Sequence, residues 1–172
     1  NEKGKLEPNQ LGAYDDKFIP GLAKIADAIH YHGSKAAVQL GHGGHRCRSN
    51  IIGEQPVSSS NVRGIWGEEP RSLTVEEIES VVEDFAEAAK RVKRAGFDGV
   101  EIHCAHGYLL RQFLSPVTNK RTDQYGGDIH GRARIVYEIL QLIKNELGSF
   151  PVWCRINGDE FVEGGQTLED AK

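Results

Sequence analysis

The chain has 172 residues, of which 38% are apolar and 27% charged, and its formal net charge is −4. This length allows one domain with a sizeable core, and the acidic balance argues against a basic nucleic-acid-binding surface. No apolar run approaches the roughly 20 residues of a membrane-spanning helix, and the polar first residues do not resemble a signal peptide. Three cysteines without a CxxC pair argue against a disulfide framework, so we expect a reduced, cytoplasmic setting.

The first third of the chain predicts a helix, a strand and a long connection. Residues 1–14 are expected to be a loop. Apolar residues at helical spacing predict a helix over 15–31, with Pro20 tolerated in its first turn. A short apolar strand over 35–40 follows. Residues 47–73, rich in Ser, Asn, Gly and Pro, then form a connection of a length that is usually functional or disordered.

Two further strands are predicted, and an amphipathic helix precedes each of them. The first helix begins with a capping box of Thr74 and Glu77 and ends before Gly96. The second helix runs from a cap at Asp128 to a stop at Gly148. The strands that follow the two helices occupy 98–103 and 151–156.

Alternating helices and strands predict an α/β protein with a parallel sheet. An eight-stranded barrel and a doubly wound open sheet both fit this order. No GxGxxG motif follows a strand, which counts modestly against a dinucleotide-binding open sheet. The sequence has no methionine, even at position 1, and it ends on LEDAK like the first turn of a helix. We therefore expect these residues to be a piece of a longer protein.

Each of the three predicted strands carries a polar residue near its carboxyl end. Side chains alternate along a strand, so Gln39, His103 and Arg155 can all face one side of the sheet. In an α/β barrel the catalytic groups lie at that end, and we expect these three to share one mouth. The alternative is that each is simply a solvated strand end. Glu101 would also face inward, and it needs a partner, for which Arg155 is a candidate.

Two histidine pairs, His42/His45 and His103/His106, have HxxH spacing, which raises the alternative of a metal-dependent barrel hydrolase. Both pairs are predicted on loops, where the spacing does not hold two nitrogens together, and no acidic third ligand is evident. We therefore predict no metal site. The cysteines are expected to be small core or loop residues.

Four stretches of the sequence are similar to one known family. They are VQLGHGG, FDGVEIHCAHGYLLRQFLSPVTNKRTDQYGG, the helix start RAR at 132–134, and FPVWCRI. They resemble the Old Yellow Enzyme family of NADH:flavin oxidoreductases, most closely the branch with 2,4-dienoyl-CoA reductase and trimethylamine dehydrogenase. The resemblance implies a partial TIM (β/α)8 barrel, roughly strands 3 to 5 with flanking helices. Residues 1–172 would then be an incomplete FMN-binding barrel domain, without its N-terminal strands and its C-terminal half.

The resemblance also implies roles for individual residues. Gln39 would hydrogen-bond the pyrimidine edge of FMN, and Arg155 would lie near its N1/O2 side, where a cation suits the charge of reduced flavin. His103 and His106 would bind the carbonyl oxygen of the substrate. Tyr108 would protonate the α-carbon of an activated alkene while the flavin delivers hydride to the β-carbon, which is the reaction of an ene-reductase.

The same resemblance implies which substrate and electron donor the protein would use. The substrate would be a small unsaturated carbonyl compound or thioester and the electron donor NAD(P)H, while any 4Fe–4S centre and FAD would belong to the missing C-terminal part. No nucleic-acid or membrane partner is expected. An isolated half barrel exposes unpaired strand edges, so we expect the fragment to self-associate and to be inactive alone.

The family commonly has QLxHxGR, whereas His45 occupies the Arg position here and Arg46 follows it, which puts the orientation of that loop in question.

Overall fold

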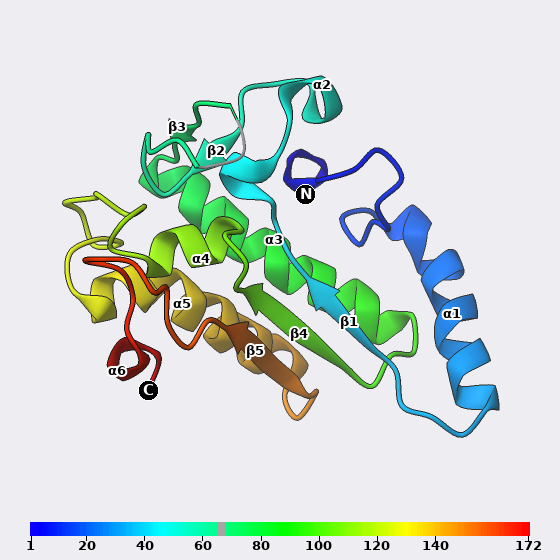
Figure 1. Ribbon diagram of the computed structural model, residues 1–172. Coiled ribbons are helices and arrows are strands. Elements are labelled where there is room, and N and C mark those ends of the chain that lie inside the picture. Colours follow the sequence, from blue (N-terminus) through cyan, green and yellow to red (C-terminus); the bar gives the residue numbers. More distant parts are fainter. Residues whose placement is uncertain (65–67) are drawn as a thin grey trace.

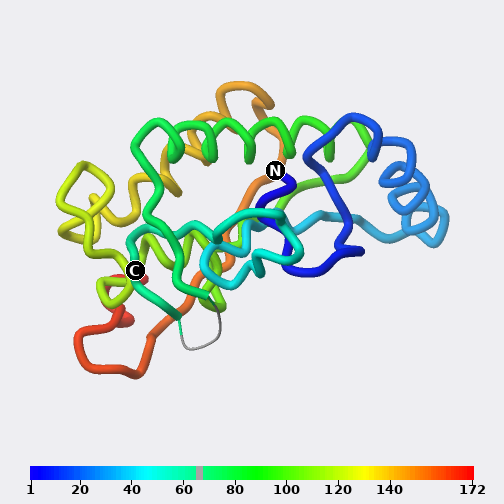
Figure 2. Tube along the Cα trace, turned by 90° about the horizontal axis from the view of Figure 1, so that it is seen from above, coloured from blue at the N-terminus to red at the C-terminus, as the bar shows by residue number. Residues whose placement is uncertain are grey.

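A parallel sheet of three strands lies at the centre of the computed structural model, which describes residues 1–64 and 68–172. The strands lie in the order β1 (Ala37–Leu40), β4 (Gly99–Cys104) and β5 (Val152–Ile156) (Figure 1). Strands that are neighbours in this sheet follow one another along the chain with a helix between them. A doubly wound sheet would instead reverse its order. The order, with both long helices on one face (Figure 2), fits the predicted partial (β/α)8 barrel of the α/β class.

Two long helices cover one face of this sheet. They are α3 (Val75–Arg94) and α5 (Ile129–Leu147), and the view from above places both on the same side of the strands (Figure 2). The strand residues that face them include Val100 and Ile102, both fully buried. Burying an aliphatic side chain of this size contributes about 1.5–3 kcal/mol, so these contacts are the main reason why the sheet and helices stay together.

The ends of both helices follow the local sequence signals. The Thr74 hydroxyl accepts a hydrogen bond from the Glu77 backbone N–H, and the Glu77 carboxylate accepts one from the Thr74 N–H. Asp128 accepts from the backbone N–H of Gly131 at the start of α5. Gly148 follows α5 with a φ of 62°, a conformation that glycine adopts without steric cost. The predicted caps are confirmed.

The N-terminal segment lies beside the free edge of β1. Helix α1 (Ile19–Tyr31) has Pro20 in its first turn, as predicted, and the short 3₁₀ helix η2 (Asp16–Phe18) precedes it. A further 3₁₀ turn, η1 (Glu2–Gly4), interrupts the loop expected over 1–14. β1 itself is two residues shorter than predicted.

The long connection over 47–73 is more ordered than the sequence indicated. It contains α2 (Ser49–Ile52) and a small parallel pair of strands, β2 (Val57–Ser58) and β3 (Arg71–Ser72). The hydroxyl of Ser59 donates to the backbone oxygen of Gln112 at 2.8 Å, which fastens the connection to the segment after β4. Residues 65–67 of this connection lie outside the described residues.

The polar segment expected after β4 also holds a helix. Helix α4 (Leu109–Leu114) is buried at all six positions. The chain closes with the turn of α6 (Leu168–Ala171), capped by Thr167. None of the helices in the described ranges has the length and hydropathy needed to span a membrane.

Candidate active site

The face of the sheet opposite α3 and α5 carries the polar strand residues. Gln39, Glu101 and Trp153 are register partners on adjacent strands and form one row across the sheet. His103 and Arg155 are partners two residues further toward the carboxyl ends. The side chains of Gln39, His103 and Arg155 therefore face the same side, as the alternation along each strand predicted.

Glu101 connects this row through its carboxylate. Its Oε1 accepts a hydrogen bond from Arg155 Nε at 2.8 Å and one from the Gln39 amide, and its Oε2 accepts one from Trp153 Nε1 at 2.8 Å. The Arg155 guanidinium and then the Gln39 amide hold the pKa of Glu101 down to about 2, so the carboxylate is ionised at neutral pH. The inward carboxylate thus has the expected arginine as one of three partners.

Three aromatic side chains gather at the end of β4. The ring centroid of His103 lies 5.0 Å from that of His106 and 4.9 Å from that of Tyr108. Burial, and next the neighbouring His106, lower the pKa of His103, which favours a neutral imidazole. Its Nδ1 atom is buried and has no hydrogen-bond partner. An unsatisfied buried polar atom is uncommon and is compatible with a site that receives a ligand.

The loops after β1 and β4 are held together by Gln112 of α4, a residue for which the sequence predicted no role. Its Nε2 donates to the backbone oxygens of Gly107 (2.8 Å) and Gly43 (3.3 Å), and its Oε1 accepts from the His45 N–H (3.2 Å). Gly44 has a φ of 60°, and a Cβ there would collide with the Gln112 amide. A polar pair, Arg111 and Gln112, inside the otherwise apolar stretch LLRQFL was the available signal.

Arg46 brings a cation to the His–Tyr cluster. Its Nη1 donates to the backbone oxygen of His106 at 2.7 Å, and its guanidinium carbon lies 5.1 Å from the centre of the Tyr108 ring. His45, by contrast, is buried. In this loop residue 46, and not residue 45, therefore carries an arginine to the cluster.

Both side chains of the first histidine pair, His42 and His45, are buried. His42 Nδ1 accepts a hydrogen bond from the Gly44 N–H at 3.1 Å, and burial lowers the pKa of His42 to about 3. In the part of the chain that the structure describes, no group of three or more His, Cys, Asp or Glu side chains could hold a metal ion. Cys47, Cys104 and Cys154 are free thiols.

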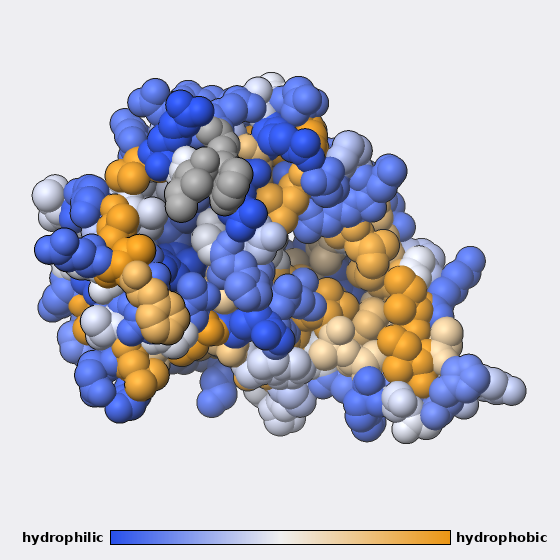
Figure 3. All heavy atoms as spheres, in the orientation of Figure 1, coloured by the Kyte–Doolittle hydropathy of each residue, from blue (hydrophilic) through white to orange (hydrophobic). Residues whose placement is uncertain are grey.

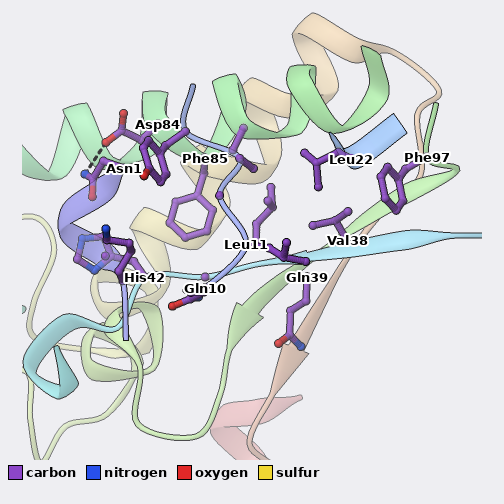
Figure 4. A pocket seen from close by; sticks show the side chains of 18 of the residues that line it. Asn1, Gln10, Leu11, Leu22, Val38, Gln39, His42, Asp84, Phe85 and Phe97 are labelled. Atoms are coloured by element: carbon purple, nitrogen blue, oxygen red, sulfur yellow. Dashed lines mark hydrogen bonds between the residues drawn. The ribbon is translucent and has the colours of Figure 1, made fainter. Parts of the chain in front are cut away.

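A cavity of about 500 Å³ lies beside the free edge of β1, away from the ends of β4 and β5. Val38 points into it toward Leu22 and Phe97, whereas Gln39 points to the other side of the strand (Figure 4). Apolar side chains also gather on the visible face between β1 and α1 (Figure 3). Of the residues expected to contact flavin or substrate, only Gln39 borders this cavity, and its side chain points away from it (Figure 4). The cavity is therefore a groove at the edge of the sheet and not the centre of the site.

The sequence matches the family model of the NADH:flavin oxidoreductase / NADH oxidase family over residues 1–172. It is 45% identical over 173 aligned positions to an NADH oxidase from Thermoanaerobacter brockii, an alignment that covers 99% of this chain and 27% of the relative. The chain thus spans about a quarter of that protein's length.

Solved structures agree with this match. Morphinone reductase superposes with a TM-score of 0.90 at 32% identity, covering 99% of this chain and 50% of that one. The Old Yellow Enzyme homologue from Zymomonas mobilis gives a TM-score of 0.90 at 29% identity, covering 99% and 51%. The chain therefore belongs to the NADH:flavin oxidoreductase / NADH oxidase family, the Old Yellow Enzyme group of oxidoreductases that use FMN and NAD(P)H.

Proposed function

We propose that the complete protein is an FMN-dependent ene-reductase and that residues 1–172 supply strands 3 to 5 of its FMN-binding barrel domain. The observation that supports this is the cluster of His103, His106 and Tyr108 at the end of β4, on the same side of the sheet as Gln39 and Arg155. The substrate would be a small unsaturated carbonyl compound or thioester. A solved relative described as a complex of 2-naphthoyl-CoA reductase with 2-naphthoyl-CoA supports a thioester.

The polar groups on the open face fit the pyrimidine edge of a flavin. This edge has an N–H donor between carbonyl acceptors. The Gln39 amide nitrogen is engaged by Glu101, which leaves the amide oxygen as an acceptor. Arg155 uses Nε for Glu101, and among the described residues its two terminal nitrogens have no hydrogen-bond partner, so they remain as donors. Gln39 and Arg155 would therefore hold this edge of FMN.

The residues after β4 would act on the substrate. Bound FMN supplies the hydride that reaches the β-carbon. His103 and His106 would bind the carbonyl oxygen and polarise the alkene, and Tyr108 would donate its phenolic proton to the α-carbon. The Arg46 guanidinium beside the ring of Tyr108 would stabilise the phenolate that remains after the transfer.

The test is to replace Tyr108 by Phe in the complete protein and to measure the two half-reactions separately by anaerobic stopped-flow spectroscopy. Loss of the general acid should slow alkene reduction by about 10²–10⁴-fold. Reduction of the flavin by NAD(P)H should persist, since the phenol takes no part in it. Tyr31→Phe, at an exposed position on α1, is the matched control and should change neither rate.

Two outcomes would contradict the proposal in different ways. Unchanged alkene reduction in Tyr108→Phe would remove Tyr108 from the mechanism. A complete protein that binds no FMN would overturn the assignment as a flavin enzyme.

A further inference from the structure

The Glu101 carboxylate is the one group in the row that contacts side chains from both neighbouring strands. It receives donors from Gln39 on β1 and from Trp153 and Arg155 on β5. The carboxylate side chain is 15% exposed, whereas that of Arg155 is 52% exposed. Glu101 is therefore less accessible than the groups that are available to a ligand, and its hydrogen bonds hold those groups in position.

The carboxylate decides which way the Gln39 amide faces. An ionised carboxylate can only accept hydrogen bonds, so the amide nitrogen of Gln39 turns toward it and the amide oxygen turns away. The opposite orientation would bring the amide oxygen against a negatively charged oxygen. Glu101 thus makes Gln39 an acceptor toward the open face.

The same carboxylate fixes the Arg155 guanidinium. It holds Nε at 2.8 Å, and the terminal nitrogens, which have no partner in the described ranges, are left as donors. It also places a negative charge next to the positive one. The pair carries no net charge while Glu101 is ionised, so a ligand beside Arg155 experiences a weaker positive field than arginine alone would give.

We propose that Glu101 is a positioning residue for the flavin: it orients Gln39 and Arg155 toward the pyrimidine edge, and its charge sets the reduction potential of the bound cofactor. This inference rests on the proposed function. Reduced flavin carries negative charge at this edge, so an uncompensated Arg155 would stabilise the reduced form more strongly. Glu101 therefore holds the potential at a more negative value than Arg155 alone would allow.

The charge is tested by Glu101→Gln in the FMN-loaded complete protein. Glutamine has almost the same shape; it removes the charge and replaces one of the two acceptor oxygens by an NH2 group. The preference for reduced over oxidised FMN should rise about tenfold, which for a two-electron couple is a shift of about 30 mV to more positive potential. The potential is measured by spectrophotometric titration against redox dyes. Glu83→Gln, the same change at an exposed position on α3, is the control and should leave the potential unchanged.

Orientation is tested by Glu101→Asp, which keeps the charge but withdraws the oxygens by one methylene. FMN affinity should fall about tenfold, the scale of one lost charge-assisted hydrogen bond. Glu101→Asp should also keep the potential closer to the wild-type value than Glu101→Gln does. An unchanged potential in Glu101→Gln together with an unchanged affinity in Glu101→Asp would overturn the inference while leaving the flavin enzyme intact. A wild-type protein without FMN would overturn the proposed function instead, and this inference with it. If Glu101→Gln does not fold, as judged by circular dichroism, the affinity of Glu101→Asp decides alone.

Discussion

His42 and His103 are each 5% exposed, and burial affects both imidazoles in the same way. Removing a cationic ring from water is unfavourable, so the pKa of each is lowered and the neutral form is retained. Burial therefore keeps the ring of His103 neutral at the position proposed to bind the carbonyl oxygen. His42 has a structural role, because its Nδ1 accepts the Gly44 N–H and so shapes the loop after β1.

The buried His42 predicts how stability depends on pH. Its pKa is about 3 in the folded chain, against an ordinary value near 6.5. Below about pH 6.5 the unfolded chain takes up a proton that the folded chain does not, so the free energy of unfolding falls as the pH drops from about 6.5 toward 3. Urea unfolding at about pH 7.5 and pH 5 should show this loss, and it should be smaller in His42→Asn, which keeps an acceptor but does not titrate.

The exposed His32 supplies the matched control for this experiment. His32→Asn should lose as much stability between the two pH values as the wild type does. Equal losses in His42→Asn and the wild type would show that another buried group, such as His45 or His103, accounts for the pH dependence.

At the scale of elements, the short helix α4 organises the loops that carry the site. Gln112 reaches from this helix to the loop after β1 through Gly43 and His45, and to the loop after β4 through Gly107. Gly43 and His45 are buried and Gly107 is half-buried, and the Gly43 oxygen also accepts from the Arg46 N–H. We infer that α4 sets the spacing between Arg46 and the His–Tyr cluster.

Replacing Gln112 by Met tests this role. The volume is nearly kept, but the His45 N–H and the Gly107 oxygen lose their side-chain partner, while the Gly43 oxygen keeps the Arg46 N–H. This should lower the free energy of unfolding by about 1–3 kcal/mol. Denaturant unfolding of the complete protein measures this loss of stability. Gln124→Met, at an exposed position, should have little effect, and an equal loss in both variants would show that the amide contacts of Gln112 contribute nothing specific.

At the scale of the whole molecule, the sheet has one covered face and one open face. The open face exposes Trp153 (43%), and Ile156 at the end of the same strand is 45% exposed. The free edge of β1 borders the cavity of about 500 Å³. Exposed strand edges with apolar surroundings promote pairing with another chain. In a full-length protein, we propose, further barrel strands would cover these surfaces.

The isolated 172-residue chain is therefore expected to self-associate and to bind FMN weakly or not at all. Gel filtration with light scattering over a concentration series measures the association. Ala37→Lys places a charge on the open face of the edge strand β1 and should shift the chain toward monomer. Gln141→Lys, exposed on α5, should not do so, and a monomeric wild-type chain that binds FMN would contradict the prediction.

The sequence by itself determined the three strands of the main sheet, the long helices and the faces that their residues occupy. The helical and strand periods, the caps at Thr74 and Asp128, and the alternation along each strand are local properties of the chain, so they could be inferred without coordinates. The same alternation placed Gln39, His103 and Arg155 on one side of the sheet.

The tertiary structure decided what these residues contact. Helix α4 is too short to show a clear period, and burial against the rest of the protein stabilises it. The position of Arg46 above Tyr108 depends on how two loops are joined by Gln112. The three donors to Glu101 depend on the register between strands more than fifty residues apart, and register is fixed by packing across the sheet rather than by either strand alone.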